Sequence, residues 1–385
     1  MNSERRQKQQ NSKSLFFDFI FAVNGLPIDG SGGAKIVAAI VNGLHGRRYR
    51  VGILVMPRSD WNKVLDPYFT GYSIPSRLVQ WLNDTPSLHR FLYPVLRRAR
   101  KGIPSCSFDR GVKIFRAGTG NTGAKFYIAT NFLSVVMLKS TNVEENRIVL
   151  FSQIDETQPL YSHQYSSVAS EIYRNLERKI FINREVADRY PPAEVIPMAI
   201  DLRLFARTVP INSRSPKSVV FILRGGEQKD PDTALGAMHH LYNEIPGIEI
   251  SAFGNIPKER VPKYVNYHFR PDNGNMVKLL NMNRIFVITS RLEGYPAPPL
   301  EAMACGCAVV ATDSVGIREY LRSGENGIMV PPGDAESIFE AVKALLNNEE
   351  KLIVISEEGY RTAQEHGYAR MIDRFIQACN DLHVR

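Results

Sequence analysis

The chain has 385 residues, 44% of them hydrophobic and 23% charged, and a formal net charge of +9. This length predicts two domains. The four cysteines are too few and too scattered to suggest a disulfide framework or a zinc site, and a reducing, cytoplasmic setting fits them. No run of about 18 apolar residues marks a membrane span.

The charge is unevenly distributed along the chain. Residues 1–200 hold 27 Lys and Arg against 16 Asp and Glu, whereas the second half is close to neutral. A basic half predicts an anionic partner, and a membrane leaflet, a phosphorylated acceptor and a nucleic acid are the candidates.

The chain opens with a strand, a glycine loop and a helix. Residues 1–13 are expected to form a disordered basic tail, and Leu15–Val23 the first strand. The loop Asp29-Gly-Ser-Gly-Gly33 precedes a helix over Ala34–Leu44, and a second strand covers Val51–Val55. Backbone N–H groups in such a loop can hold a phosphate, and an ordinary glycine turn is the alternative.

Residues 60–125 show no clear periodicity. Within them, residues 86–101 mix apolar side chains with Arg90, Arg97, Arg98, Arg100 and Lys101. A basic amphipathic segment of this kind can lie on an anionic membrane. The alternative is a solvated helix that packs on its own domain.

Strands resume before the middle of the chain. They are expected at residues 126–129, 147–151, 179–182 and 194–196, with helices near 131–139 and 166–176. Gln153, Asp155 and Glu156 directly follow the strand that ends at Phe151. Polar side chains at the carboxyl end of a strand are candidates for touching an acceptor hydroxyl, and a plain turn is the alternative.

The second half alternates strands and helices cleanly, which is typical of parallel sheets. Strands are expected at 218–223, 248–253, 285–289, 307–311 and 327–330, with helices at 232–243, 274–281, 299–305, 316–321 and 335–347. A linker is expected near 200–216. The last helix, from Tyr368 to Leu382, has an apolar stripe that must dock on a neighbour, and the first domain is one candidate.

Two cations follow the first strand of this half. Arg224 and Lys229 flank a glycine turn, where Arg can bind two phosphate oxygens and Lys acts as a point charge. Solvated surface charge is the alternative. Asp230-Pro-Asp232 has the D-x-D spacing of metal-bound nucleotide sites, but Asp232 as the N-cap of the next helix explains it better, so no metal is expected.

Two carboxylates bracket the stretch E-G-Y-P-A-P-P-L-E. Glu293 and Glu301 lie between an apolar strand and an apolar helix, where ligands of parallel sheets bind. They are expected to line one wall of a ligand cleft and to accept hydroxyl groups. The alternative for Glu301 is a purely electrostatic role in the first helical turn.

Residues 217–345 resemble the retaining glycosyltransferases of family 4. The matching segments are Arg224 with Lys229, then residues 290–306, 308–313, 316–320, 324–327 and 330–334. Residues 196–205 are similar to the interdomain stretch of that family. The Tyr-Pro…Pro-Pro-Leu-Glu pattern and residues 153–183 resemble a bacterial rhamnosyltransferase branch, which implies a deoxythymidine-diphosphate sugar.

The resemblance implies an α/β GT-B fold, in which two Rossmann-like domains with parallel sheets face each other across a cleft. The expected parts are the tail at 1–13, an acceptor-binding domain at 14–205, a nucleotide-sugar-binding domain at 206–365, and a helix at 366–385 that packs back on the first domain.

The resemblance also implies roles for individual residues. Arg224 and Lys229 would hold the donor diphosphate, Glu301 the ribose hydroxyls, and Glu293 would face the donor sugar as a catalytic residue. Backbone N–H groups of Gly294 and Tyr295 would meet the sugar-phosphate, and Gly32 and Gly33 would close over it. Pro296, Pro298 and Pro299 depart from the family pattern because proline has no N–H to donate.

The implied activity is metal-independent transfer of a hexosyl or deoxyhexosyl group, with retention and no cofactor, from a nucleoside-diphosphate sugar. The acceptor would be lipid-linked or a polysaccharide in cell-envelope synthesis, at the inner face of the membrane. The alternatives are a GT-B epimerase or phosphorylase and, from another class, a nucleic-acid-binding protein using the basic half, for which no motif is present.

Overall fold

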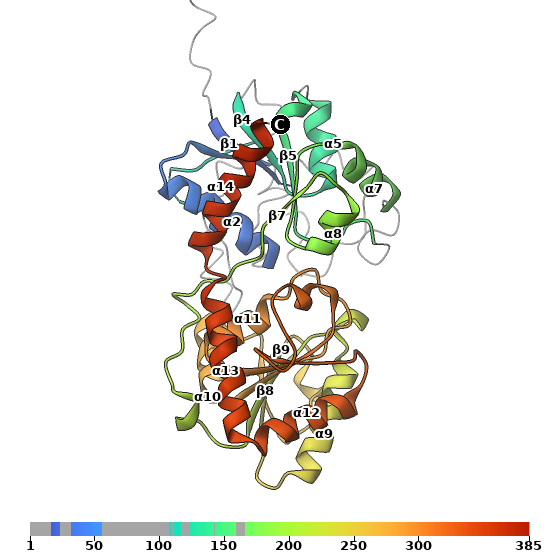
Figure 1. Ribbon diagram of the computed structural model, residues 1–385, viewed down its shortest axis with the longest axis vertical. Coiled ribbons are helices and arrows are strands. Elements are labelled where there is room, and N and C mark those ends of the chain that lie inside the picture. The colour runs from blue at the N-terminus through green and yellow to red at the C-terminus, as the bar shows by residue number, and fades with distance from the viewer. Residues whose placement is uncertain are drawn as a thin grey trace, which may run out of the picture.

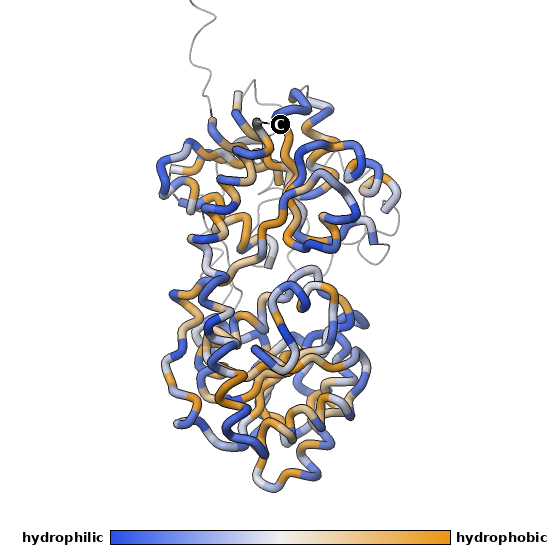
Figure 2. Tube along the Cα trace, in the orientation of Figure 1, coloured by the Kyte–Doolittle hydropathy of each residue, from blue (hydrophilic) through white to orange (hydrophobic). Residues whose placement is uncertain are grey.

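The computed structural model describes residues 17–23, 32–55, 108–109, 111–116, 123–141, 143–158 and 166–384. They form two lobes stacked along the long axis of the molecule (Figure 1). Each lobe is built around a parallel sheet whose strands are almost entirely buried, because helices cover both faces of such sheets. Figure 2 shows the hydrophobic stretches concentrated on these inner strands.

The first sheet has the strand order β3-β2-β1-β4-β5-β6-β7. Its strands are β1 (Phe17–Val23), β2 (Val51–Val55), β3 (Lys113–Arg116), β4 (Ala124–Ala129), β5 (Ile148–Ser152), β6 (Lys179–Phe181) and β7 (Glu194–Val195). The helices of this lobe are α2 (Gly32–Gly46), α5 (Phe132–Ser140), α7 (Ser166–Asn175) and α8 (Arg184–Arg189). All neighbouring strands of this sheet pair in parallel, so the carboxyl ends of the strands share one edge.

The second sheet has the order β10-β9-β8-β11-β12-β13 and is also parallel. Its strands are β8 (Ser218–Leu223), β9 (Glu249–Gly254), β10 (Val265–Phe269), β11 (Ile285–Ile288), β12 (Ala308–Thr312) and β13 (Ile328–Val330). The helices around it are α9 (Pro231–Glu244), α10 (Asn273–Met282), α11 (Ala297–Ala304), α12 (Ala335–Leu346) and α13 (Glu349–Gln364).

The chain crosses between the lobes twice, and the two crossings run side by side. Ile200 pairs with Gly367 as an isolated parallel bridge, and the Ile200 N–H donates to the His366 carbonyl at 2.8 Å. After the second crossing, α14 (Tyr368–Val384) runs along α2 in the first lobe.

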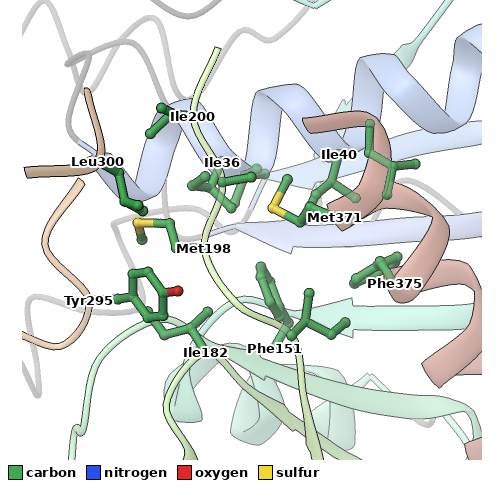
Figure 3. Close-up of a cluster of buried hydrophobic side chains, with 14 of the residues drawn as sticks. Ile36, Ile40, Phe151, Ile182, Met198, Ile200, Tyr295, Leu300, Met371 and Phe375 are labelled. Carbon is green, nitrogen blue, oxygen red and sulfur yellow. The ribbon is translucent and has the colours of Figure 1, made fainter. Parts of the chain in front are cut away.

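The apolar stripe of α14 docks on the first sheet. Phe375 is fully buried, and its ring centroid lies 5.9 Å from that of Phe21 and 5.7 Å from that of Phe151. Figure 3 shows Phe375 and Met371 beside Ile40 of α2, in a cluster that continues to Met198, Tyr295 and Leu300 at the lobe boundary. We call this set of side chains the interdomain cluster.

Several expected elements differ in the structure. Residues 316–321 form no α-helix but lie in a 3-10 helix over Val315–Glu319. Strands β3 and β10 and helix α13 were not expected. Six of the 16 residues of α13 are charged, so its buried face shows only weakly in the periodicity.

Candidate functional site

Lys229 and Glu293 meet at the carboxyl edge of the second sheet. Lys229 ends a short 3-10 helix, Glu227–Lys229, that follows β8, and Glu293 lies in the loop after β11. Lys229 Nζ lies 2.6 Å from Glu293 Oε1, and Ser290 Oγ donates to the same oxygen at 2.8 Å. Both charged side chains are mostly buried, so their ion pair is shielded from solvent on part of its surface.

Asp230 fixes the position of Lys229. Its backbone is left-handed (φ 47°, ψ 60°), and its side chain accepts from the Thr233 N–H, so Asp230 is the N-cap of α9. The expectation that Asp232 caps this helix was wrong, because Pro231 already occupies its first position. Asp230 Oδ2 pairs with Arg291 Nε at 2.8 Å, which ties the two cleft loops together.

Arg224 and the turn after it face solvent at the same edge. The turn uses Gly226 at φ 112°, a conformation that L side chains rarely adopt. The Gly225 N–H donates to Asn255 Oδ1 at 3.0 Å, which anchors the turn to the end of β9. Arg224 therefore projects from a backbone that is held at both sides.

Glu301 lies half-buried in the first turns of α11. Burial raises the pKa of its carboxyl group, and the cations Lys35 and Arg224 act to lower it. Lys35 comes from α2 of the first lobe, so the two lobes bring opposite charges together here. The sequence analysis did not single out Lys35. A lysine near the start of a helix is unfavourable for the helix dipole, and this could have marked Lys35 as a candidate site residue.

The first lobe meets this edge through Gly33 and Gln153. Gln153 Nε2 donates to the Gly33 carbonyl at 3.3 Å, and a Cβ added at Gly33 would lie 3.3 Å from Gln153 Oε1. Gly32 is the first residue of α2, directly before this contact. The strand-following turn and the glycine segment are thus in contact, as a shared binding wall requires.

Gly294 lies against the first lobe. A Cβ there would come 3.2 Å from the Gln153 carbonyl oxygen, and Asn183 Nδ2 donates to the Gly294 carbonyl at 3.2 Å. The next residue, Tyr295, points its ring into the interdomain cluster and is only 5% exposed (Figure 3). Only the backbone of Tyr295 is therefore placed to meet a substrate, and its role remains a prediction.

Asp155 and Glu156 point in different directions. Burial acts to raise the Asp155 pKa, but hydrogen bonds from Thr157, Arg189 and Gln158 outweigh it and lower the pKa overall. Arg189 Nη2 lies 2.5 Å from Asp155 Oδ2. Asp155 is thus held ionised at the cleft, with both oxygens already accepting hydrogen bonds.

Glu156 does not face the cleft, and the expectation that it touches an acceptor was wrong. Its carboxyl group accepts from the Phe132 N–H at 3.0 Å and from the Tyr173 hydroxyl at 2.9 Å. Burial raises its pKa to about 7, against a lowering influence from these bonds. Ser152 Oγ joins the network at 2.7 Å from the Tyr173 hydroxyl.

A cavity of about 200 Å³ lies between the lobes. The turn after β5, the end of β6 and α8 line it from the first lobe, and the loop Leu292–Gly294 with Val315 lines it from the second. It contains Gln153, Asp155, Glu293 and Gly294 of the expected site residues. It also contains Asn183, which ends a segment that resembles the rhamnosyltransferase branch, and Glu185 and Arg189, which the sequence analysis did not single out.

Some expectations fall outside the described residues. These are the tail at 1–13, the loop residues 29–31, and the basic segment 86–101. Cys305 and Cys307 are fully buried and pack among apolar side chains. In the described ranges, no helix is long and apolar enough to cross a bilayer, and no three His, Cys, Asp or Glu side chains gather as a metal site.

The second lobe matches a known protein family. Residues 207–362 match the model of the glycosyl transferases group 1. Among curated proteins, a poly(glycerol-phosphate) alpha-glucosyltransferase of Bacillus subtilis is 24% identical over 57% of this chain and 35% of its own length. An N-acetylgalactosaminyltransferase of Campylobacter jejuni named for a diphospho-undecaprenol substrate is 28% identical over 29% of this chain and 31% of its own. The chain thus matches about a third of the length of these relatives.

Solved structures match nearly the whole chain. The sucrose-phosphate synthase of Thermosynechococcus elongatus superposes with a TM-score of 0.66 at 15% identity, covering 95% of this chain and 99% of that one. Anabaena HepE, solved with UDP and glucose, gives 0.64 at 14% identity over 95% and 100%. At such identities the likeness establishes the fold. The second lobe therefore matches the glycosyl transferases group 1 over residues 207–362, and the chain as a whole has the GT-B fold.

Proposed function

We propose that this protein is a retaining glycosyltransferase that moves a sugar from a nucleoside-diphosphate sugar to a glycan or lipid-linked acceptor. The observation that carries the proposal is the Lys229–Glu293 ion pair, which lies with Arg224 and Glu301 at the carboxyl edge of the second sheet. Gly33 and Gln153 of the first lobe face that edge. The relatives named as glucosyl- and N-acetylgalactosaminyltransferases support the reaction class.

The donor diphosphate would be held by cationic side chains. Three of the positions at the start of α11 are prolines, so that helix offers few N–H groups to an anion. Arg224 and Lys229 must therefore supply most of the balancing charge when the diphosphate leaves. In this proposal Lys229 exchanges Glu293 for a phosphate oxygen, and Glu293 becomes available to accept a donor-sugar hydroxyl.

Retention would follow from attack of the acceptor hydroxyl on the face that the diphosphate leaves, without a protein nucleophile. We also propose that no metal ion is required, because the two cations occupy the place where a metal would neutralise the diphosphate. The donor nucleotide, with UDP and deoxythymidine diphosphate as candidates, and membrane docking through residues 86–101 remain predictions.

Donor hydrolysis across a panel of nucleotide-sugars tests the proposal. One or a few sugars are expected to be cleaved, and Arg224→Ala and Glu301→Ala should weaken nucleotide binding in calorimetric titrations about tenfold or more. Unchanged titrations for both variants would refute the cleft assignment. Full loss of turnover in a chelator, restored by Mg²⁺ or Mn²⁺, would refute metal independence, and epimerised or phosphorolysed products would identify a different enzyme.

A further inference from the structure

The cavity between the lobes has a volume and a lining that indicate which kind of ligand it can hold. Glu293 from the second lobe and Arg189 of α8 from the first both line it. Its volume of about 200 Å³ lies below the roughly 300–1,000 Å³ that is common for drug-sized ligands. One sugar ring is therefore a better match for this space than an oligosaccharide.

The lining suits the two kinds of surface that a sugar presents. The apolar side chains in it are Ile154, Phe181, Ile182, Val186, Leu292 and Val315. They can pack on the C–H face of a ring. Gln153 Oε1 is buried without a hydrogen-bond partner and can accept from a hydroxyl group.

The charges in the cavity oppose an anionic ligand. Among the described lining residues, Asp155, Glu185 and Glu293 are acidic and only Arg189 is basic. Arg189 is occupied, because it pairs with Asp155 at 2.5 Å and donates from Nε to the Glu185 carbonyl at 3.4 Å.

Neighbouring cations are occupied as well. Lys229 pairs with Glu293, and Arg318, which interacts electrostatically with Glu185, makes two hydrogen bonds to Asp313 at 2.6 and 3.0 Å. Among the described residues, the Glu185 carboxylate makes no ion pair within 4.0 Å. Arg189 and Arg318 interact with it electrostatically but form no ion pair with it, so the Glu185 carboxylate would repel a phosphate or carboxylate placed in the cavity.

We infer that this cavity receives a single neutral sugar unit of the acceptor, and that Glu185 excludes anionic sugars from it. This rests on the proposed function and adds the class of acceptor. The basic composition of the first half of the chain suggests a phosphorylated sugar, whereas the charge that lines the cavity opposes one. Phosphates of a lipid-linked acceptor would lie outside the cavity, beyond the sugar that accepts.

Binding of matched monosaccharides tests the inference. The probes are neutral methyl hexopyranosides of the gluco, galacto, manno and rhamno series, with methyl uronosides as charged counterparts of the first three. Saturation-transfer NMR at low salt on the full chain should show at least one neutral sugar binding about tenfold more tightly than any uronoside.

Variants at two positions of α8 distinguish the effect of the Glu185 charge from the effect of the net charge of the protein. Glu185→Lys should reduce the preference for neutral sugars about tenfold or reverse it, and Glu185→Gln should have an intermediate effect. Asp188→Lys makes the same charge change on α8 outside the cavity lining and should leave the preference unaltered. Ile154→Trp should block binding of all the sugars, which places them in this cavity.

Three outcomes would each overturn the inference. They are equal or tighter binding of uronosides by the wild type, no binding of any neutral sugar, and equal effects of the Glu185 and Asp188 variants. UDP and deoxythymidine diphosphate titrations of the same samples keep the two proposals apart. If the protein binds a nucleotide but the sugar experiments fail, only the inference is overturned. If it binds neither nucleotide, the proposed function is overturned as well.

Discussion

The two edges of the cleft are built by different rules. On the second-lobe edge, Arg224, Lys229, Glu293 and Glu301 all lie in the segments that follow two neighbouring strands, β8 and β11, and a sequence pattern marks each of them. On the first-lobe edge, Asp155 depends on Arg189 from another element, and Lys35 acts across the lobe boundary. Local motifs thus mark the proposed donor side, and tertiary contacts define the proposed acceptor side.

The largest effect is expected for α14, the helix that packs back on the first lobe. Phe375→Ala removes a fully buried ring that contacts Phe21 and Phe151, and should lower the free energy of unfolding by about 3–5 kcal/mol. Denaturant titration measures this. Val354→Ala, at a 52% exposed position on α13, is the control and should change little. A similar loss in both variants would mean that α14 contributes no special packing.

The donor edge should depend on Lys229 for catalysis more than for folding. Lys229→Ala removes the cation that faces the leaving diphosphate and should lower kcat about 10²–10³-fold. Lys343→Ala, which breaks a surface pair with Glu244, should keep full activity. Steady-state transfer or donor-hydrolysis rates provide the comparison, and parity between the two variants would contradict the role of Lys229.

The acceptor edge should depend on pH through Glu156, which anchors the turn behind Gln153. Its pKa is raised from 4.5 to about 7 in the folded protein. The folded state therefore binds this proton more tightly, so its contribution to stability is complete below pH 4.5 and is lost as pH rises through about 7. The loss should approach about 3 kcal/mol.

Unfolding free energies of the wild type and Glu156→Gln between pH 4.5 and 8 test this. The wild type should lose stability relative to the variant as pH rises, because Gln stays neutral. Glu171→Gln, at an exposed position on α7, controls for the general effect of pH. Parallel curves for the wild type and Glu156→Gln would show that Glu156 titrates without linkage to folding.

The fold could be predicted largely because its parallel strands are continuous apolar runs, such as Ser218–Leu223 and Ala308–Thr312, separated by amphipathic helices. The GT-B expectation is confirmed by structures that cover nearly the whole chain. Strand β10 was missed because it is only partly buried and has a mixed composition, so it lacks the apolar run of a central strand.

The sequence by itself determined most strands of the two sheets, and it singled out Lys229 and Glu293, which meet at the edge of the second sheet. Strand periodicity and loop motifs act over a few neighbouring residues, so they can be read from the chain directly. Only the tertiary structure decided that Glu156 turns inward and that Glu185 lines the cavity with no ion pair within 4.0 Å among the described residues. Burial and charge pairing at those positions depend on residues tens of positions away, which no local pattern encodes.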